Sequence, residues 1–96
     1  MITQWHTTFR QDFNIADAFG AGAVKDTYKR AFADWKNSVV YMTELCVVLN
    51  WKIFEHVQKK NVEMASLYNS LWEMVDAYCQ THFKGKDLQY FYEITD

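Results

Sequence analysis

The chain has no proline, only three glycines and only two cysteines among its 96 residues. Proline kinks or ends helices, so its absence leaves long segments free to be helical. The two cysteines, Cys46 and Cys79, are too few for a disulfide scaffold. We expect both to be buried thiols of a protein in a reducing compartment.

The sequence also lacks an apolar run of the ~18 to 20 residues that a membrane span requires. Its longest candidate, residues 39–54, is interrupted by polar side chains that include Glu44 and Lys52. The first residues, Met1–His6, show neither the basic nor the apolar region of a secretory signal. These absences predict a cytoplasmic protein without membrane contact.

A basic net charge is missing as well, because the formal net charge is -2. Residues 21–60 carry seven basic and four acidic side chains, whereas residues 61–96 carry two and six. Proteins that bind nucleic acid through their overall charge usually have a basic domain or a dense basic stripe. The acidic second half therefore disfavours DNA as a partner of the whole molecule and permits complementary contact between copies.

Hydrophobic residues make up 50% of the chain and aromatic residues 18%. Such a composition buries enough surface to offset the entropy lost on ordering, which excludes a disordered chain. A chain of this length can also bury a core without disulfides or metal. We expect one domain over residues 1–96.

Helical periodicity predicts an all-α fold, a small helical bundle of three main helices. The main helices are expected at residues 22–37, 38–58 and 62–83, with a short N-terminal helix at 8–19 and a short C-terminal helix at 88–94. Residues 88–94 also alternate in the manner of a strand.

Capping residues set these boundaries. Thr8 and Gln11 have the spacing of a capping box, and Gly20 separates the first two helices. The side-chain oxygen of Ser38 can accept an unpaired amide hydrogen at the next helix start. Gly85 is expected to adopt the left-handed conformation that ends the fourth helix.

The helix predicted at 38–58 has two apolar stripes on opposite sides. One stripe comprises Met42, Leu45, Cys46, Leu49, Ile53 and Val57, and the other comprises Val40, Val47, Trp51 and Phe54. The second stripe should be covered, because an exposed Trp and Phe would forgo several kcal/mol of burial, at ~25 cal/mol per Å². Two alternatives remain for what covers it. The cover is either the N-terminal helix of the same chain, with Trp5, Phe9 and Phe13, or a partner, which is a second copy or another protein.

Several residues have the types found in catalytic or metal sites, but not the spacing. A zinc site would draw on Cys46, His56, Cys79 and His82, although no paired-ligand knuckle is present. Glu73 and Asp76 lie one turn apart, a spacing that suits a pair of acidic catalysts and is equally common on any solvated helix face. We therefore predict no enzyme, no catalytic residue, no metal or other cofactor and no small-molecule ligand.

A DNA-binding alternative comes from residues 15–20 and the helix that follows them. Ala16 and Gly20 fall where a helix-turn-helix has its small residue and its turn glycine, and Lys25, Lys29 and Lys36 would contact phosphates. The position six residues after the glycine is apolar in that motif and is Asp26 here. A degenerate helix-turn-helix is thus the alternative to a simple turn between two packed helices.

Four segments resemble a known group of sequences: IADAFG at 15–20, AFADWK at 31–36, TELCVVLNWK at 43–52 and YFYEITD at 90–96. They are similar to small uncharacterised all-helical proteins of gut bacteria that are often encoded near conjugative and integrative elements. The resemblance covers most of the chain and carries no catalytic motif. It implies a cytoplasmic accessory protein of a bacterial mobile element.

The preferred interpretation is a non-enzymatic protein–protein interaction module, associated with itself or with another protein through Val40, Val47, Trp51 and Phe54. Aromatic side chains within an apolar patch are typical of interface centres. The alternative from another class is a small DNA-binding regulator that uses Lys25, Lys29 and Lys36.

Overall fold

The computed structural model describes residues 3–95 of the chain, with side chains from residue 9 onward, and these residues form helices and turns without a strand. In chain order the helices are α1 (Thr3–Phe19), α2 (Ala21–Trp35), α3 (Val39–Gln58), α4 (Val62–His82) and α5 (Lys86–Thr95). The all-α prediction is confirmed. No helix in this described part has the length and apolar character of a membrane span.

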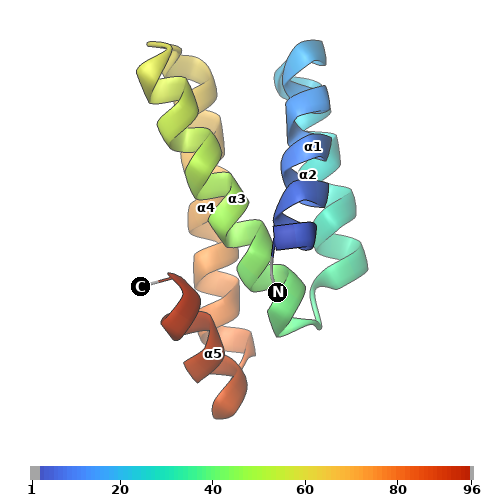
Figure 1. Cartoon of the computed structure of the whole chain (residues 1–96), viewed down its shortest axis with the longest axis vertical. Helices are drawn as coiled ribbons and strands as arrows, with labels where there is room; N and C mark the ends of the chain where they lie inside the picture. The colour runs from blue at the N-terminus through green and yellow to red at the C-terminus, as the bar shows by residue number, and fades with distance from the viewer. Residues whose placement is uncertain (1–2, 96) are drawn as a thin grey trace.

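The helices form two antiparallel hairpins with α5 at one end (Figure 1). The α1–α2 hairpin lies beside the α3–α4 hairpin, so that α1 and α3 lie nearer the viewer and α2 and α4 lie behind them. Helix α3 contacts all four other helices, and its largest contact is with α4. It is therefore the central helix, as its two apolar stripes predicted.

Two capping side chains begin the longest helices. The Tyr41 N–H donates to Ser38 Oγ at 3.3 Å at the start of α3, which confirms the predicted cap. The Met64 N–H donates to Asn61 Oδ1 at 3.2 Å at the start of α4. The predicted main helices agree with α2, α3 and α4 to within two residues at each end.

The ends of the chain differ more from the prediction. Helix α1 begins at Thr3, so Thr8 lies inside it and the capping-box interpretation is wrong. Gly85 has the expected left-handed φ of 62°. Helix α4, however, ends at His82, with an extended Phe83 as its C-cap, and Gly85 instead precedes α5. Residues 88–94 are helical, which excludes the strand alternative.

The core fills the space between the two hairpins and α5. Its largest fully buried apolar side chains are Phe13, Val24, Met42, Leu45, Val48, Leu49, Tyr68, Val75 and Phe91. Cys46 and Cys79 are buried free thiols, as expected, and burial raises the pKa of each to about 12. Both thiols therefore stay protonated near neutral pH.

Val57 is the exception in the first predicted stripe of α3, because it is 57% exposed. It borders a hollow of about 600 Å³ between the end of α3 and the start of α4. The α4 residues on this hollow include Ala65, Ser66 and Ser70, whose small side chains cannot reach across it. The expectation that Val57 is buried is wrong for this reason.

Candidate functional site

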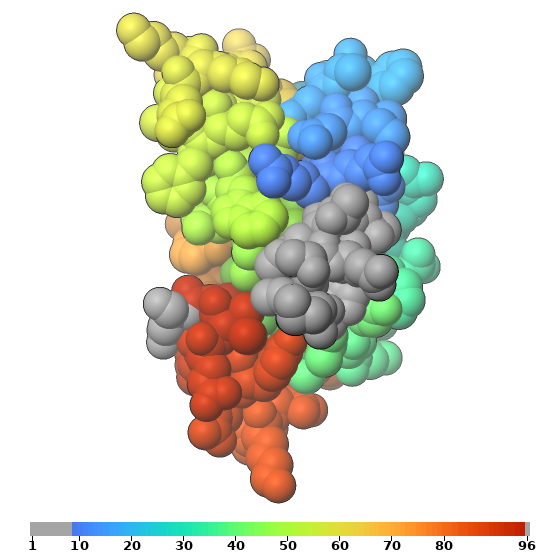
Figure 2. Space-filling model, in the orientation of Figure 1, coloured from blue at the N-terminus to red at the C-terminus, as the bar shows by residue number. Residues whose placement is uncertain are grey.

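The second stripe of α3 is divided into a covered half and an exposed half. Val40 and Val47 are half-buried, whereas Trp51 is 38% exposed and Phe54 is 60% exposed. Figure 2 shows the C-terminal half of α3, coloured yellow-green, at the surface beside α1 and above α5. The four predicted residues thus share one side of the helix, and two of them face solvent.

Helix α1 supplies only part of the cover that the sequence allowed for. Phe9 and Phe13 point into the core, where they make edge-on contacts with Tyr41 and Tyr68. The Arg10 guanidinium lies 5.3 Å from the ring centroid of Trp51 and shields part of that ring. The side chain of Trp5, the remaining predicted cover, lies outside the described residues.

Two valines extend the exposed half of the stripe around the end of the helix. Val57 follows Phe54 by one turn, and Val62, which is 75% exposed, borders the same hollow as Val57. We call Trp51, Phe54, Val57 and Val62 the α3 patch. From the sequence, Val57 was assigned to the opposite, buried stripe, and nothing pointed to Val62.

Beneath the α3 patch, a set of polar side chains joins α1, α3 and α4. We call it the buried polar cluster, and it comprises Asn14, Asp17, Lys52, Glu55, His56 and Tyr68. Lys52 is its centre and is 1% exposed. The Lys52 Nζ donates to Asn14 Oδ1 at 2.7 Å and lies 2.6 Å from Asp17 Oδ2 and 2.8 Å from Glu55 Oε2.

Asp17 accepts from three other members of the cluster. Besides the ammonium of Lys52, it receives the hydroxyl of Tyr68, and His56 Nε2 lies 3.0 Å from its Oδ2. Burial acts to raise the pKa of Asp17, but the contacts with Lys52, Tyr68 and His56 outweigh it, so the pKa is lowered. Burial and the neighbouring carboxylate raise the pKa of Tyr68. Asp17 is therefore ionised and Tyr68 is neutral at pH 7.

The charged and polar groups of this cluster form an ion-pair network and not a metal site. Among the described residues, Asp17, Glu55 and His56 form the one group whose potential metal-ligand atoms all lie within 4.8 Å of one another. The ammonium of Lys52 already lies between the two carboxylates. A divalent cation there would be repelled by this ammonium at close range. The geometry thus favours a role in joining α1 to α3 and α4.

The residues considered for zinc and for acid catalysis are not assembled into sites. Their cysteines do not belong to the metal-ligand group above, and His82 is exposed and stacks on Tyr78. Of the acidic pair, Asp76 accepts from Gln80 at 2.8 Å, and Glu73 is exposed.

The lysines of the DNA-binding alternative lie on α2. Lys25, Lys29 and Lys36 are all exposed, and their spacing places them on one side of this helix. Helices α1 and α2, however, run antiparallel side by side (Figure 1). A helix-turn-helix crosses its two helices at about 90 to 120°. The pair has the geometry of a helical hairpin, which gives the DNA-binding alternative no support.

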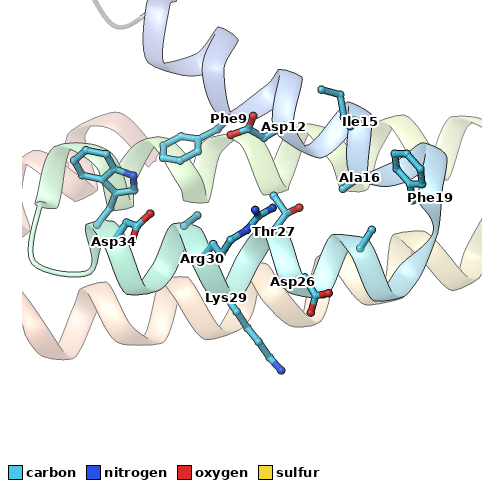
Figure 3. Close-up of a pocket in the computed structure, with 13 residues that line it drawn as sticks. Phe9, Asp12, Ile15, Ala16, Phe19, Asp26, Thr27, Lys29, Arg30 and Asp34 are labelled. Carbon is cyan, nitrogen blue, oxygen red and sulfur yellow. The ribbon is translucent and has the colours of Figure 1, made fainter.

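A groove of about 870 Å³ runs between α1 and α2 on their outer side (Figure 3). Phe19 and Ile15 lie at one end, and Asp12, Arg30 and Asp34 line its middle and other end. The acidic and basic side chains alternate along the groove. This mixed lining gives no clear preference for the charge of an occupant.

Comparisons with protein-family models, with curated proteins and with solved structures found no match to this chain.

Proposed function

We propose that this protein is a non-enzymatic interaction module that binds another protein through the α3 patch. The observation that carries the proposal is the exposure of Trp51, Phe54, Val57 and Val62 on neighbouring turns of the central helix and at the adjoining start of α4. Contiguous exposed apolar patches of this kind mark interaction sites. The sequence resemblance supports a cytoplasmic accessory protein of a bacterial mobile element as the setting.

The size of the patch fits the centre of an interface. From the exposed fractions of its two aromatic residues and two valines, the patch presents about 400 Å² of apolar surface. A standard interface buries about 800 Å² on each partner and has an apolar centre with a polar rim. The α3 patch would supply that centre, with Trp51 and Phe54 as its aromatic anchors.

Basic side chains around the patch indicate the character of the partner. Arg10 lies over Trp51 on one side, and the exposed Lys59 and Lys60 follow at the end of α3. Lys59 lies 3.4 Å from Glu55, and the exposed Glu63 follows Val62, so the surroundings of the patch carry both charges with an excess of basic ones. Two copies joined patch to patch would bring these cations together, which weakens that form of self-association. A different protein with an apolar surface and an acidic rim fits the patch better.

The proposal is tested by photocrosslinking in the bacterium that produces the protein. A photoreactive phenylalanine analogue replaces Phe54 in one variant and Asn50, an exposed polar residue one turn earlier on α3, in the control. We expect a defined crosslinked protein at position 54 that is weak or absent at position 50. Light scattering of Phe54→Glu and Asn50→Glu separates self-association through the patch from binding of a different protein.

The proposal is wrong if position 54 gives no crosslink beyond that of position 50 and Phe54→Glu leaves the solution mass unchanged. Both variants place the change on a solvent-exposed side chain, and circular dichroism verifies that each remains folded.

A further inference from the structure

A second groove lies between α2 and α4, on the side of the molecule away from the α3 patch. Figure 1 shows α2 and α4 behind α1 and α3. The groove has a volume of about 610 Å³, and its floor contains Phe32 and Tyr78. Their rings pack edge-on, with their centroids 4.8 Å apart. Neither the interaction module proposed above nor the buried polar cluster uses this surface.

The walls of this groove allow another helix to approach closely. Ala33 of α2 and Ala77 of α4 have minimal side chains, so nothing bulky stands above the floor at these two positions. Met74 lines the groove one turn before Ala77 on α4 and is 55% exposed. Methionine is flexible and adapts to an apolar surface packed against it. The groove is thus apolar and shallow, and the flexible Met74 side chain forms part of its α4 wall.

The α2 edge of the groove is basic. Lys29 and Lys36 line it, and none of the lining residues between positions 9 and 95 is acidic. Lys29 borders both grooves of α2, because it also lines the α1–α2 groove (Figure 3). No ion pair joins Lys29 or Lys36 to an acidic side chain among residues 9–95.

On the α4 side of the groove, an acidic residue lies at about the same level along the helices as Lys29. Glu73 is exposed, directly precedes Met74 and lies one helical turn before Ala77, so it projects beside the groove. Phe32 and Tyr78 are in ring contact between two helices that run in the same direction (Figure 1). Lys29 lies three residues before Phe32 and Glu73 five residues before Tyr78, so their levels along the helices differ by about 3 Å, at 1.5 Å per residue. The groove has a basic edge and an acidic edge.

We infer that a second copy of the chain docks into the α2–α4 groove to form a symmetric dimer. Helices α2 and α4 run in the same direction (Figure 1). A twofold axis parallel to them places α2 of each copy on α4 of the other, at unchanged height. Lys29 of one copy then faces Glu73 of its partner, and the twofold symmetry forms this pair twice. The apolar groove residues of the two copies, with Met74 among them, pack against each other.

The contact area predicts a reversible dimer. Helix α2 has 15 residues and is therefore about 22 Å long. A face about 20 Å wide over that length buries about 450 Å² on each copy, or about 900 Å² in all. This total lies below the standard range of about 1,200 to 2,000 Å². We expect dissociation in the micromolar range.

Charge reversal tests the dimer by sedimentation velocity between about 1 and 500 µM protein, a range that brackets micromolar dissociation constants. Lys29→Glu and Glu73→Lys should each weaken the dimer by about tenfold or more, because each places two like-charged pairs in the contact. The double variant exchanges the charges and should restore most of the affinity. Lys84→Glu and Asp87→Lys are the matched controls, because both residues are exposed and neither lines the groove, and they should leave the dissociation constant unchanged.

Three outcomes overturn the inference: a native chain that stays monomeric throughout this range, single variants that associate like the native chain, or a double variant that remains as weak as the single ones. Phe54→Glu separates the two proposals. Loss of the dimer in that variant, with Lys29→Glu unaffected, would place the self-association on the α3 patch and leave the α2–α4 groove unused. Failure to crosslink a partner at position 54 would leave the dimer inference intact.

Discussion

Replacing Lys52 by methionine tests what the buried polar cluster contributes to stability. The Lys52 side chain is 1% exposed, and its ammonium lies within 2.8 Å of oxygen atoms of Asn14, Asp17 and Glu55. Methionine keeps most of the volume and removes the charge. The carboxylates of Asp17 and Glu55 would then remain without their closest cation.

Removal of one partner of a buried ion pair costs about 3 to 5 kcal/mol. The side chains of Asp17 and Glu55 are 17% and 29% exposed, so water still reaches both carboxylates and the expected loss is about 3 kcal/mol. A domain of this length has a free energy of unfolding of about 5 to 14 kcal/mol. Lys52→Met should therefore fold, with a thermal midpoint about 12 to 24 °C lower.

The loss of unfolding free energy in Lys52→Met should also depend on pH. Burial acts to raise the pKa values of Asp17 and Glu55, but Lys52 and the other donors lower both overall. A lowered folded-state pKa contributes stability above the unfolded values, about 3.9 and 4.3, and that stability is lost as the pH falls through the folded-state values. The gap between the native chain and Lys52→Met should narrow below about pH 4.

Urea unfolding followed by circular dichroism, at about pH 7 and about pH 3, measures both effects. Lys59→Met is the control, because Lys59 is an exposed lysine 3.4 Å from the same Glu55 carboxylate. An exposed pair contributes about 0 to 1 kcal/mol. The reasoning fails if Lys52→Met loses no more stability than Lys59→Met at pH 7, or if its loss is the same at both pH values.

Two further predictions concern the thiols and the joint between α1 and α2. In the native protein a disulfide reagent at about pH 8 should leave Cys46 and Cys79 unmodified, because burial raises both pKa values to about 12 and the thiolate is the reactive form. Both should react in urea, and rapid labelling of the folded chain would contradict their burial. Gly20→Ala should lower the free energy of unfolding by about 1 to 3 kcal/mol, because Gly20 has a φ of 108°, although an added Cβ would meet nothing within 4 Å. Gly22→Ala, equally open but helical, should be neutral or stabilising by up to about 1 kcal/mol, and equal losses in the two variants would refute the conformational explanation.

The helix boundaries that were predictable from the sequence depend on local interactions. Ser38 bonds to an amide only three residues away, so the residue type and its position before an apolar run identify the start of α3. Thr8 and Gln11 have equally good spacing but lie within α1. A capping box requires a non-helical backbone at its first residue, and the residue types alone do not reveal that conformation.

The buried polar cluster was not predictable because its members are distant in the sequence. Asp17 and Lys52 meet only when α1 packs on α3, and in the sequence Lys52 is simply an interruption of an apolar run. A partial signal exists in the spacing, since Lys52 and Glu55 are one turn apart on α3 and Asn14 and Asp17 are one turn apart on α1. A pair of polar residues one turn apart on each of two helices is a weak indication of a polar contact between those helices.

Of the α3 patch, the sequence predicts Trp51 and Phe54 but not the exposure of Val57 and Val62, which again depends on tertiary packing. Periodicity places Val40, Val47, Trp51 and Phe54 on one side of α3, and the structure keeps them there. Which of them stay exposed depends on where α1 and α5 end against α3, and that is a property of the packed molecule. Exposure at Val57 and Val62 likewise follows from the small side chains of α4.

The three donors that converge on Asp17 also fix the rotational setting of α1. The apolar contacts of α1, through Phe9, Phe13 and Ala16, would tolerate a small roll of the helix about its own axis. A slip by one residue turns a helix by about 100° and would carry the Asp17 carboxylate away from Lys52, leaving the buried ammonium with Glu55 of its own helix as its carboxylate partner. The cluster thus favours the same alignment of α1 that buries Phe13 and Ala16, and it adds a polar requirement to that apolar one.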